Sequence, residues 1–336
     1  MKIDIVYTWV DGADPKWNKK RNAIAEKLGN KVSNNANSEA RFKQNDELKY
    51  SLRSVFQFAP WVNNIFIVTD NQSPSWLDVS HPKITIIDHA SIFKDKAPLP
   101  SFSSRGIESN LHRIKNLSGH FISFNDDVFL GRLTKPTHFF TPIGKPYKFT
   151  TSILPQKRKW HFDRSKLKSQ QNNEHKHAII NSRKLISSSL KIDIHHDFRH
   201  TVKPMFKSVI FELEKKYSTA FLQTSKHLFR ESSAIVPSHL FGFYAIAKNI
   251  GKVKYLKLIH KKARWSDILY KSIINFSYAY VNLSTANVQA VLNKIKKVQP
   301  STFYINQYSD ISTKTIEQMK LFLESYFPEK AEYEIE

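Results

Sequence analysis

The stretch Phe121–Gly131, FISFNDDVFLG, places two adjacent carboxylates at the end of an apolar run. Its first four residues are typical of a buried strand, and Asn125, Asp126 and Asp127 follow directly before apolar residues resume. Neighbouring carboxylates at such a position are unfavourable unless a positive charge or ion lies close to them. The doublet is therefore the first candidate for a functional site.

Alternating strands and helices in the first part of the chain would position this doublet. Short apolar or β-branched runs predict four strands, at residues 2–10, 64–70, 83–89 and 120–127. Helical spacing predicts helices at residues 15–28 and 45–59, separated by a polar loop at 29–40. This order predicts an α/β fold with a Rossmann-like, largely parallel sheet.

The character of the chain changes after about residue 155. Helical spacing predicts helices in residues 177–188, 203–217 and 236–251. Lys203-Pro204 and Val236-Pro237 are the expected starts of the last two, because proline suits the first turn of a helix. Strand character returns at 301–310, and an amphipathic C-terminal helix is predicted at 313–328.

Several predicted strands end in acids or amides, at Asp11, Asp70, Asp88 and the Asn125–Asp127 triplet. In open α/β sheets the ligand binds outside the carboxyl ends of the strands. A structural alternative, in which both aspartates cap a following helix, is weak because VFLG does not resemble a helix start. The pattern therefore predicts a site at this edge of the sheet.

The composition is strongly basic, with a formal net charge of +23. From Lys157 to Lys271 there are 25 Lys and Arg against 8 Asp and Glu. Such a field attracts polyanions such as nucleic acid, anionic lipid or a phosphate-containing polymer, although a solvated basic surface without a specific partner is the plain alternative.

The chain has no cysteine, no apolar run long enough to span a membrane and no signal peptide at its start, which predicts a cytoplasmic enzyme.

Motifs of other enzyme classes are absent from the sequence. There is no GxGxxG, Walker loop, HExxH or GxSxG, so dinucleotide dehydrogenases, P-loop NTPases and common hydrolases have no support. The pairs His175/His177 and His195/His196 could be metal ligands, but such isolated pairs are more often surface histidines.

Three long blocks resemble the Stealth family of hexose-1-phosphate transferases: IDIVYTWVDG (Ile3–Gly12), the block Arg41–Leu77 and the block Leu99–Gly131. His200–Tyr217 with Phe229–Asn249 is similar to a third conserved family block, and FYINQYSD to a fourth. The family includes bacterial capsular polysaccharide phosphotransferases and the animal enzyme that builds the mannose 6-phosphate tag. The sequence departs from the family where Asn306 is followed by Gln307 rather than Asp, and around Glu108.

The resemblance implies a GT-A-like fold and a reaction in which a sugar moves with its proximal phosphate from a UDP-sugar to an acceptor hydroxyl. Asp126 and Asp127 would hold Mg²⁺ (or Mn²⁺), which prefers one or two carboxylates together with phosphate oxygens. Arg230 would grip phosphate oxygens, and Asp127 would also be catalytic. His200 is the expected base, with Glu108 as its competitor or as an orienter of the acceptor.

The remaining residues implied by the matching blocks would bind substrate. Trp9, Asp11 and Gly12 would face the base and ribose, with Gly12 giving the backbone room to approach the ligand. The full set of expected substrate-binding residues is Trp9, Asp11, Gly12, Arg41, Asn45, Arg53, Ser104, Asn125, Lys203 and Asn306. The alternative for Arg53, which lies on a predicted helix, is an ordinary ion pair on the surface.

The expected organisation is a nucleotide-sugar-binding core made of residues 1–155 and 300–336, with a mainly helical, basic segment, 156–299, completing the active site. The expected function is transfer of hexose-1-phosphate, in particular N-acetylhexosamine-1-phosphate, from a UDP-sugar to a growing capsular or cell-surface polysaccharide, with release of UMP. The alternatives are a metal-dependent glycosyltransferase that releases UDP and a non-catalytic polyanion-binding module. Expected partners are the donor, a phosphate-containing acceptor and, peripherally, anionic membrane at the inner face of the cytoplasmic membrane or capsule export machinery, with no specific nucleic acid.

Overall fold

The computed structural model of this 336-residue chain describes most of its length. The residues described are 1–29, 32–33, 36–38, 42–151, 174–259, 277–307 and 311–335.

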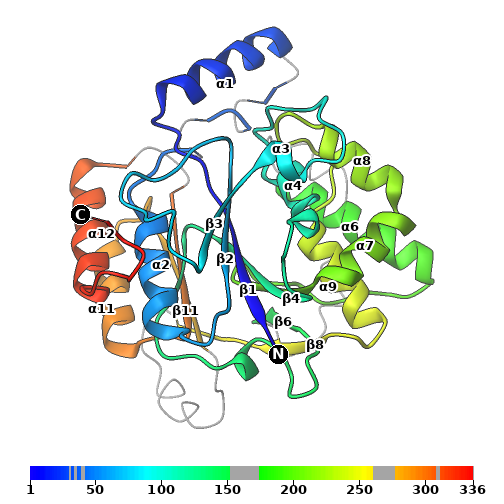
Figure 1. Cartoon of the computed structure of the whole chain (residues 1–336). Helices are drawn as coiled ribbons and strands as arrows, with labels where there is room; N and C mark the ends of the chain where they lie inside the picture. The colour runs from blue at the N-terminus through cyan, green and yellow to red at the C-terminus, as the bar shows by residue number, and fades with distance from the viewer. Residues whose placement is uncertain are drawn as a thin grey trace.

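A five-stranded sheet forms the centre of the molecule (Figure 1). The strand order is β3-β2-β1-β4-β7; the first four strands are parallel to their neighbours, and β7 lies antiparallel to β4 at the edge. The predicted α/β architecture with a largely parallel sheet is confirmed. The strands span Ile3–Thr8 (β1), Ile65–Thr69 (β2), Ile84–Asp88 (β3), His120–Asn125 (β4) and Lys203–Phe206 (β7).

A second sheet of four strands has the order β5-β11-β10-β9, in which β10 pairs in parallel with β9 and β11, and β5 runs antiparallel to β11. Two further strands, β6 and β8, form a parallel pair. The bounds of these strands are Val128–Leu130 (β5), Tyr147–Thr150 (β6), Lys252–Tyr255 (β8), Lys257–Leu258 (β9), Ser277–Asn282 (β10) and Thr302–Asn306 (β11).

Helices lie on both sides of the central sheet. Figure 1 shows α2, α11 and α12 on one side and α4, α6, α7, α8 and α9 on the other. The helices span Pro15–Leu28 (α1), Glu47–Phe58 (α2), His89–Ile92 (α3), Ser104–Glu108 (α4), Glu174–Leu190 (α6), Lys207–Lys216 (α7), Ser218–Lys226 (α8), Pro237–Ala247 (α9), Val288–Val298 (α11) and Thr313–Tyr326 (α12), with 3₁₀ turns at Leu111–Arg113 (η3) and Pro136–His138 (η4). Within the residues that the structure describes, every helix is too short or too polar to span a bilayer.

The central strands are buried on both faces, as a parallel sheet covered by helices requires. Along β1, Ile5 and Tyr7 belong to the core shared with α2, while Val6 between them belongs to the core shared with α7, α8 and α9. This alternation follows from the two-residue period of a strand. The sheet is therefore fixed on both sides, and its edges provide a rigid frame for a site.

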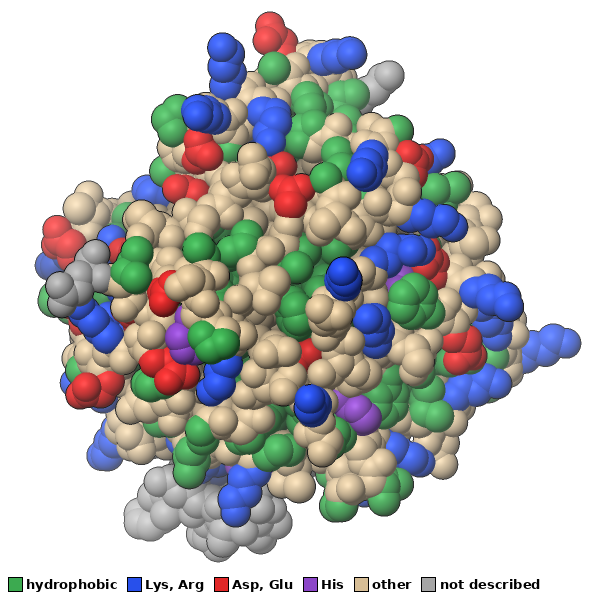
Figure 2. All heavy atoms as spheres, in the orientation of Figure 1, with side chains coloured by type: hydrophobic (Ala, Val, Ile, Leu, Met, Phe, Trp, Pro, Cys, Tyr) green, Lys and Arg blue, Asp and Glu red, His purple; other side chains and the backbone are tan. Residues whose placement is uncertain are grey.

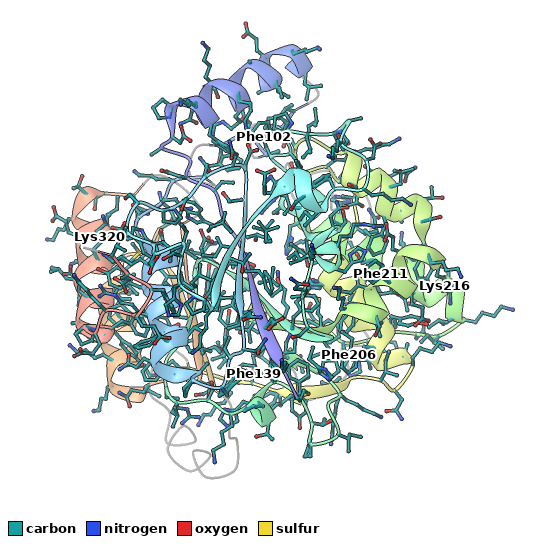
Figure 3. All side chains as sticks on the ribbon, viewed as in Figure 1. Phe102, Phe139, Phe206, Phe211, Lys216 and Lys320 are labelled. Atoms are coloured by element: carbon teal, nitrogen blue, oxygen red, sulfur yellow. The ribbon has the colours of Figure 1, made fainter. Side chains whose placement is uncertain are left out.

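Helix α1 is attached to the rest of the molecule through aromatic contacts. Asp14 caps the helix by accepting a hydrogen bond from the Lys16 backbone N–H at 2.8 Å, as the Asp14-Pro15 pair predicts. The buried Trp17 ring packs against Phe42 and Phe102, with ring centroids 5.0 and 5.3 Å apart. Figure 3 shows Phe102 directly beneath α1.

The expected helix start at Lys203-Pro204 is wrong. These residues belong to β7, and helix α7 begins only at Lys207. Because β7 is an edge strand, Pro204 can be accommodated without breaking a ladder between two central strands. The expected start at Val236-Pro237 is confirmed, since α9 begins at Pro237.

The segment 156–299 is not helical throughout, because it supplies β7 to the central sheet and β10 to the second sheet. Its division from a core of residues 1–155 and 300–336 stays a prediction. The basic residues at Lys157 and Lys271 lie outside the described residues. Among the described ones, Lys and Arg side chains spread over the face in Figure 2 and gather on the side of α7 and α8.

Candidate active site

The candidate site lies where two neighbouring parallel strands end. Thr8 at the end of β1 pairs with Asn125 at the end of β4, so Trp9 and the Asp126–Asp127 doublet emerge at the same edge. The antiparallel strand β7 begins at this edge, because Lys203 pairs with Ser123 of β4. His200, three residues before Lys203, is therefore brought to the doublet from a segment more than 70 residues further along the chain.

A second antiparallel pairing brings β11 to the same place. Strand β5 starts directly after Asp127, and Val128 pairs with Tyr304 of β11. The backbone N–H of Ile305 donates to the carbonyl of Asp127 at 3.1 Å. Asn306 thus lies one residue from a direct contact with the doublet, although its own role in binding stays a prediction.

The two aspartates are half-buried, and their pKa values reflect it. Burial raises the pKa of Asp126 to about 7, and the neighbouring charge of Asp127 adds to the rise. Burial also raises the pKa of Asp127 to about 7, against the opposing effect of the positive charges of Lys203 and Arg230. Such raised values mean that the charged forms of both carboxyls are disfavoured where they lie, and shifts of this size are common among functional-site residues.

His200 faces Asp127. Its Nε2 lies 3.8 Å from Oδ1 of Asp127, beyond hydrogen-bond distance, and both atoms are buried without a hydrogen-bond partner among the described residues. The histidine is positioned by Tyr278, whose hydroxyl donates to its carbonyl at 2.9 Å, and by Tyr304, whose ring centroid lies 4.3 Å from the imidazole. Burial, followed by the positive charges of Lys203 and Arg230, lowers the pKa of His200 to about 3. The imidazole is therefore neutral at pH 7 and has a ring nitrogen that can accept a proton.

Two cationic side chains are anchored beside the doublet. The ammonium of Lys203 donates to Oδ1 of Asn125 at 3.2 Å, and Nε of Arg230 donates to the hydroxyl of Ser104 at 3.0 Å. The fold thus forms two hydrogen-bonded pairs from residues that were expected at the site: Lys203 with Asn125, and Arg230 with Ser104. Lys203 and Arg230 thus place two positive charges beside the carboxyls, and their binding of phosphate oxygens stays a prediction.

Glu108 has a different environment from His200. Its Oε1 accepts the backbone N–H of Ser238 at 2.9 Å, so the carboxylate covers the first turn of α9. A carboxylate at this end of a helix is favoured by the unsatisfied N–H groups and by the helix dipole. This contact is consistent with an orienting role for Glu108. Nε2 of His200, in contrast, has no hydrogen-bond partner among the described residues.

The end of β1 forms a compact turn. The side-chain amide of Gln72 makes two hydrogen bonds to the backbone of Asp11: its oxygen accepts from the N–H at 2.9 Å, and its nitrogen donates to the carbonyl at 3.0 Å. A Cβ built on Gly12 would lie 2.1 Å from the carbonyl oxygen of Phe42. The glycine is therefore required by the close approach of the chain's own backbone. Contact of Trp9, Asp11 and Gly12 with a nucleotide stays a prediction.

Arg53 is used in a structural contact instead of a substrate contact. Its guanidinium makes a two-pronged ion pair with Glu334, at 2.7 and 2.8 Å, and also donates to the carbonyl of Phe327 at 2.9 Å. Arg53 and the Glu334 side chain are both buried. The expectation that Arg53 binds substrate is therefore corrected, because its donors tie α2 to the C-terminal segment. Arg41, another expected substrate residue, lies outside the described residues.

Replacing Arg53 with Met should therefore lower stability without weakening donor binding. Removing one partner of a buried ion pair leaves an uncompensated charge and costs about 3–5 kcal/mol in the free energy of unfolding. Urea unfolding measures the loss, and the double variant Arg53→Met/Glu334→Gln should recover part of it. Unchanged stability together with lost donor binding would return Arg53 to the substrate site.

The doublet fits a divalent ion of the magnesium type. It supplies two adjacent carboxylates, and Oδ1 of Asp127 is buried without a hydrogen-bond partner among the described residues. Within that part of the chain, no group of three or more His, Asp or Glu side chains could hold a metal, so the pairs His175/His177 and His195/His196 form no such cluster. Mg²⁺ is commonly bound by one or two carboxylates and completed by phosphate oxygens and water, so a two-carboxylate site suits it.

Sequence reasoning missed two polar residues beside the doublet. Gln44 donates from Nε2 to Oδ2 of Asp126 at 3.0 Å and accepts the Trp9 indole N–H at 2.9 Å. Glu47 is largely buried, and burial followed by the charge of Asp126 raises its pKa to about 7. Glu47 in turn accepts two hydrogen bonds from Asn45, so Asn45 has a role inside this loop. The only sequence signal was their place within the Arg41–Leu77 block.

Comparison with known proteins places these residues in conserved regions. The chain matches conserved region 1 of Stealth proteins at residues 1–29, conserved region 2 at 41–148 and conserved region 3 at 199–247. Trp9 lies in the first region, Asp126, Asp127 and Glu108 in the second, and His200, Lys203 and Arg230 in the third.

Curated relatives match over nearly the whole chain. It is 36% identical to an exopolysaccharide phosphotransferase of Streptomyces coelicolor and 35% identical to the exopolysaccharide phosphotransferase CpsY of Mycobacterium leprae. These matches cover 99% of this chain but only 52% and 57% of the relatives, so the chain spans little more than half of their length.

Solved structures show a more distant likeness. A galactosyltransferase, LgtC, in complex with donor and acceptor sugar analogues is 12% identical, with a TM-score of 0.41 and coverage of 96% of this chain and 95% of that one. Mouse xyloside xylosyltransferase 1 is 11% identical, with a TM-score of 0.38 and coverage of 90% and 97%. The family assignment depends instead on the three conserved regions and the curated relatives: this chain belongs to the Stealth family.

Proposed function

We propose that this protein transfers hexose-1-phosphate, in particular N-acetylhexosamine-1-phosphate, from a UDP-sugar to a hydroxyl of a growing capsular or cell-surface polysaccharide, releasing UMP. The observation that carries the proposal is the convergence of residues from three Stealth regions on one edge of the sheet. Trp9, the Asp126–Asp127 doublet and the group of His200 and Lys203 come from regions 1, 2 and 3 respectively. The names of the curated relatives, which are exopolysaccharide phosphotransferases, support phosphotransfer to an exopolysaccharide.

The charges of the site suit an attack at phosphorus. Asp126 and Asp127 would hold Mg²⁺ or Mn²⁺, which supplies charge stabilisation to the diphosphate. Lys203 and Arg230 would bind the oxygens of the phosphate bonded to the sugar, and their anchors, Asn125 and Ser104, would hold them in place. Because the bond that breaks joins the two phosphorus atoms through oxygen, the anomeric bond of the sugar is retained and the nucleotide leaves as its monophosphate.

His200 would take the proton of the acceptor hydroxyl. Its pKa of about 3 keeps the imidazole neutral at physiological pH, and its Nε2 is directed at the same space as Oδ1 of Asp127. A histidine with such a low pKa is a weak base in the free protein, and the proton it receives would be stabilised by the nearby carboxylate. Glu108, which covers the start of α9, would orient the acceptor.

The acceptor would be held by charge as well as by the site. A phosphodiester polymer carries one negative charge for each repeat, and the described Lys and Arg side chains on the side of α7 and α8 form a basic surface that suits such a chain. The alternative partner for the same charge is anionic lipid at the inner face of the cytoplasmic membrane, where a capsule would be exported.

The released nucleotide tests the proposal. The protein is incubated with a panel of sugar nucleotides and a polysaccharide primer, and the nucleotides are separated by ion-exchange chromatography. The expected product is UMP, formed only when both a UDP-sugar and primer are present. Release of UDP would instead identify a glycosyltransferase, and no release with any donor would favour a non-catalytic polyanion-binding module.

A further inference from the structure

Gln44 links two parts of the site that differ in chemistry. Its amide oxygen accepts the indole N–H of Trp9 at 2.9 Å, and its amide nitrogen donates to Oδ2 of Asp126 at 3.0 Å. An indole N–H can only donate, so it fixes the oxygen of the Gln44 amide on the Trp9 side. The amide N–H₂ must then face Asp126, and a carboxylate oxygen there can only accept.

The loop that carries Gln44 is held in place on both sides. Before it, the carbonyl of Phe42 accepts the backbone N–H of Gly12 at 3.0 Å. After it, Asn45 donates from its side chain to Glu47 at 3.0 Å, and Asp46 has a left-handed backbone with φ of 68°. Aspartate is among the few residue types that adopt this conformation readily. The loop therefore presents Gln44 to Asp126 in a defined orientation.

We infer that Gln44 is a positioning residue that orients the Asp126 carboxylate for a divalent cation and couples this carboxylate to Trp9. The inference rests on the proposed function only in taking Asp126 and Asp127 as cation ligands. The amide donates to Oδ2 of Asp126 and so fixes the orientation of the carboxylate, whose remaining lone pairs would be available to a cation. Hydrogen bonds that orient ligating carboxylates are part of a metal site, and their loss weakens metal binding.

The coupling of Trp9 to Asp126 through Gln44 predicts an effect that would be absent if Gln44 acted on Asp126 alone. Trp9 makes no hydrogen bond to either aspartate among the contacts of the described residues, yet its indole N–H fixes the amide that does. Replacing Trp9 with Phe should therefore weaken cation binding through Gln44. Once Gln44 is replaced by Met, which has a similar shape but no amide, the Trp9 substitution should have no further effect.

The test is a Mn²⁺ titration of the purified protein without nucleotide, with the free ion followed by electron paramagnetic resonance. Gln44→Met should weaken Mn²⁺ affinity by about 10-fold or more, the usual effect of losing such an orienting contact. Trp9→Phe should weaken it by about 2- to 10-fold, the range for one hydrogen bond. The double variant should match Gln44→Met. Gln57→Met, an exposed glutamine on α2, is the matched control and should bind Mn²⁺ like the unaltered chain.

The outcomes separate this inference from the proposed function. If the unaltered chain binds Mn²⁺ and Gln44→Met binds it equally well, the inference is overturned and the proposed function is untouched. Additive losses in the double variant overturn the coupling through Gln44. Absence of Mn²⁺ binding to the unaltered chain overturns the inference together with the metal-dependent chemistry. A result in which Mn²⁺ binding follows the prediction but UDP is released would leave the inference standing and refute phosphotransfer.

Because Gln44→Met could disturb the loop, Gln44→Asn, which keeps an amide on a shorter side chain, should show the same loss with unchanged thermal unfolding.

Discussion

Asp127→Asn is expected to remove most transfer activity, by about 10³-fold, while the protein stays folded. Charge stabilisation by a divalent ion is worth several kcal/mol in the transition state, and each 1.36 kcal/mol is a factor of ten in rate. Asparagine keeps the size of the side chain but loses the charge that faces His200 and that, in the proposed function, would hold the ion. Initial rates of nucleotide release, with and without a chelator and with Mg²⁺ or Mn²⁺ restored, measure the effect. Full turnover of the unaltered protein in excess chelator would contradict it.

The same substitution should stabilise the metal-free protein, in a manner that depends on pH. The pKa of Asp127 is about 7 in the folded protein and close to 3.9 when the chain is unfolded. A raised carboxyl pKa means that the folded state is favoured below the unfolded pKa and loses this advantage as pH rises toward 7. In the presence of chelator, Asp127→Asn should therefore unfold at a higher temperature than the unaltered chain at pH 8, with little difference at pH 4. Equal unfolding temperatures at pH 8 would show that the pKa of the Asp127 carboxyl is not raised in the folded protein.

His200→Ala is expected to lower turnover by about 10²- to 10⁴-fold, the usual size of a general base contribution. Donor binding should change little, because Lys203 and Arg230 are anchored to Asn125 and Ser104 rather than to the imidazole. Turnover and donor affinity are measured separately, by steady-state kinetics and by calorimetry with a non-reacting donor analogue. His195→Ala, which changes a histidine five residues away, is the matched control.

Glu108→Gln distinguishes the two base candidates. Glutamine can still accept the Ser238 N–H at the start of α9, so the variant keeps the structural contact and loses only the negative charge. A modest loss of turnover fits an orienting role. If Glu108→Gln is inactive while His200→Ala is nearly normal, the roles of the two residues must be exchanged.

Local patterns were sufficient to predict the parallel part of the fold. Strands buried on both faces are short apolar runs, and β1, β2, β3 and β4 all lie within their predicted ranges. The edge strand β7 was missed because four residues containing Pro204 resemble a helix start, and only pairing with β4 makes them a strand. Helix α11 was omitted although Val288, Val291, Leu292 and Ile295 have helical spacing and are buried together.

The acids of the site could be predicted, but their surroundings could not. Asp126 and Asp127 stand out in the sequence because two carboxylates after an apolar strand are costly. Gln44 gives no such signal, since a glutamine is ordinary in a polar loop and its contact with Asp126 spans 82 residues. Arg53 was misassigned for a related reason, because its partner Glu334 lies 281 residues away and only the fold brings it to α2.

The position of the phosphorus atom in the product tests the central claim most directly. The donor is a UDP-sugar whose sugar-linked phosphate carries ³²P, and the primer is separated from nucleotides after reaction. The account predicts that the label enters the polysaccharide, that phosphodiester linkages appear there, and that the released UMP is unlabelled, because the sugar moves together with its phosphate. Label recovered in UDP, with an elongated but unlabelled polysaccharide, would contradict it and show that the protein transfers the sugar alone.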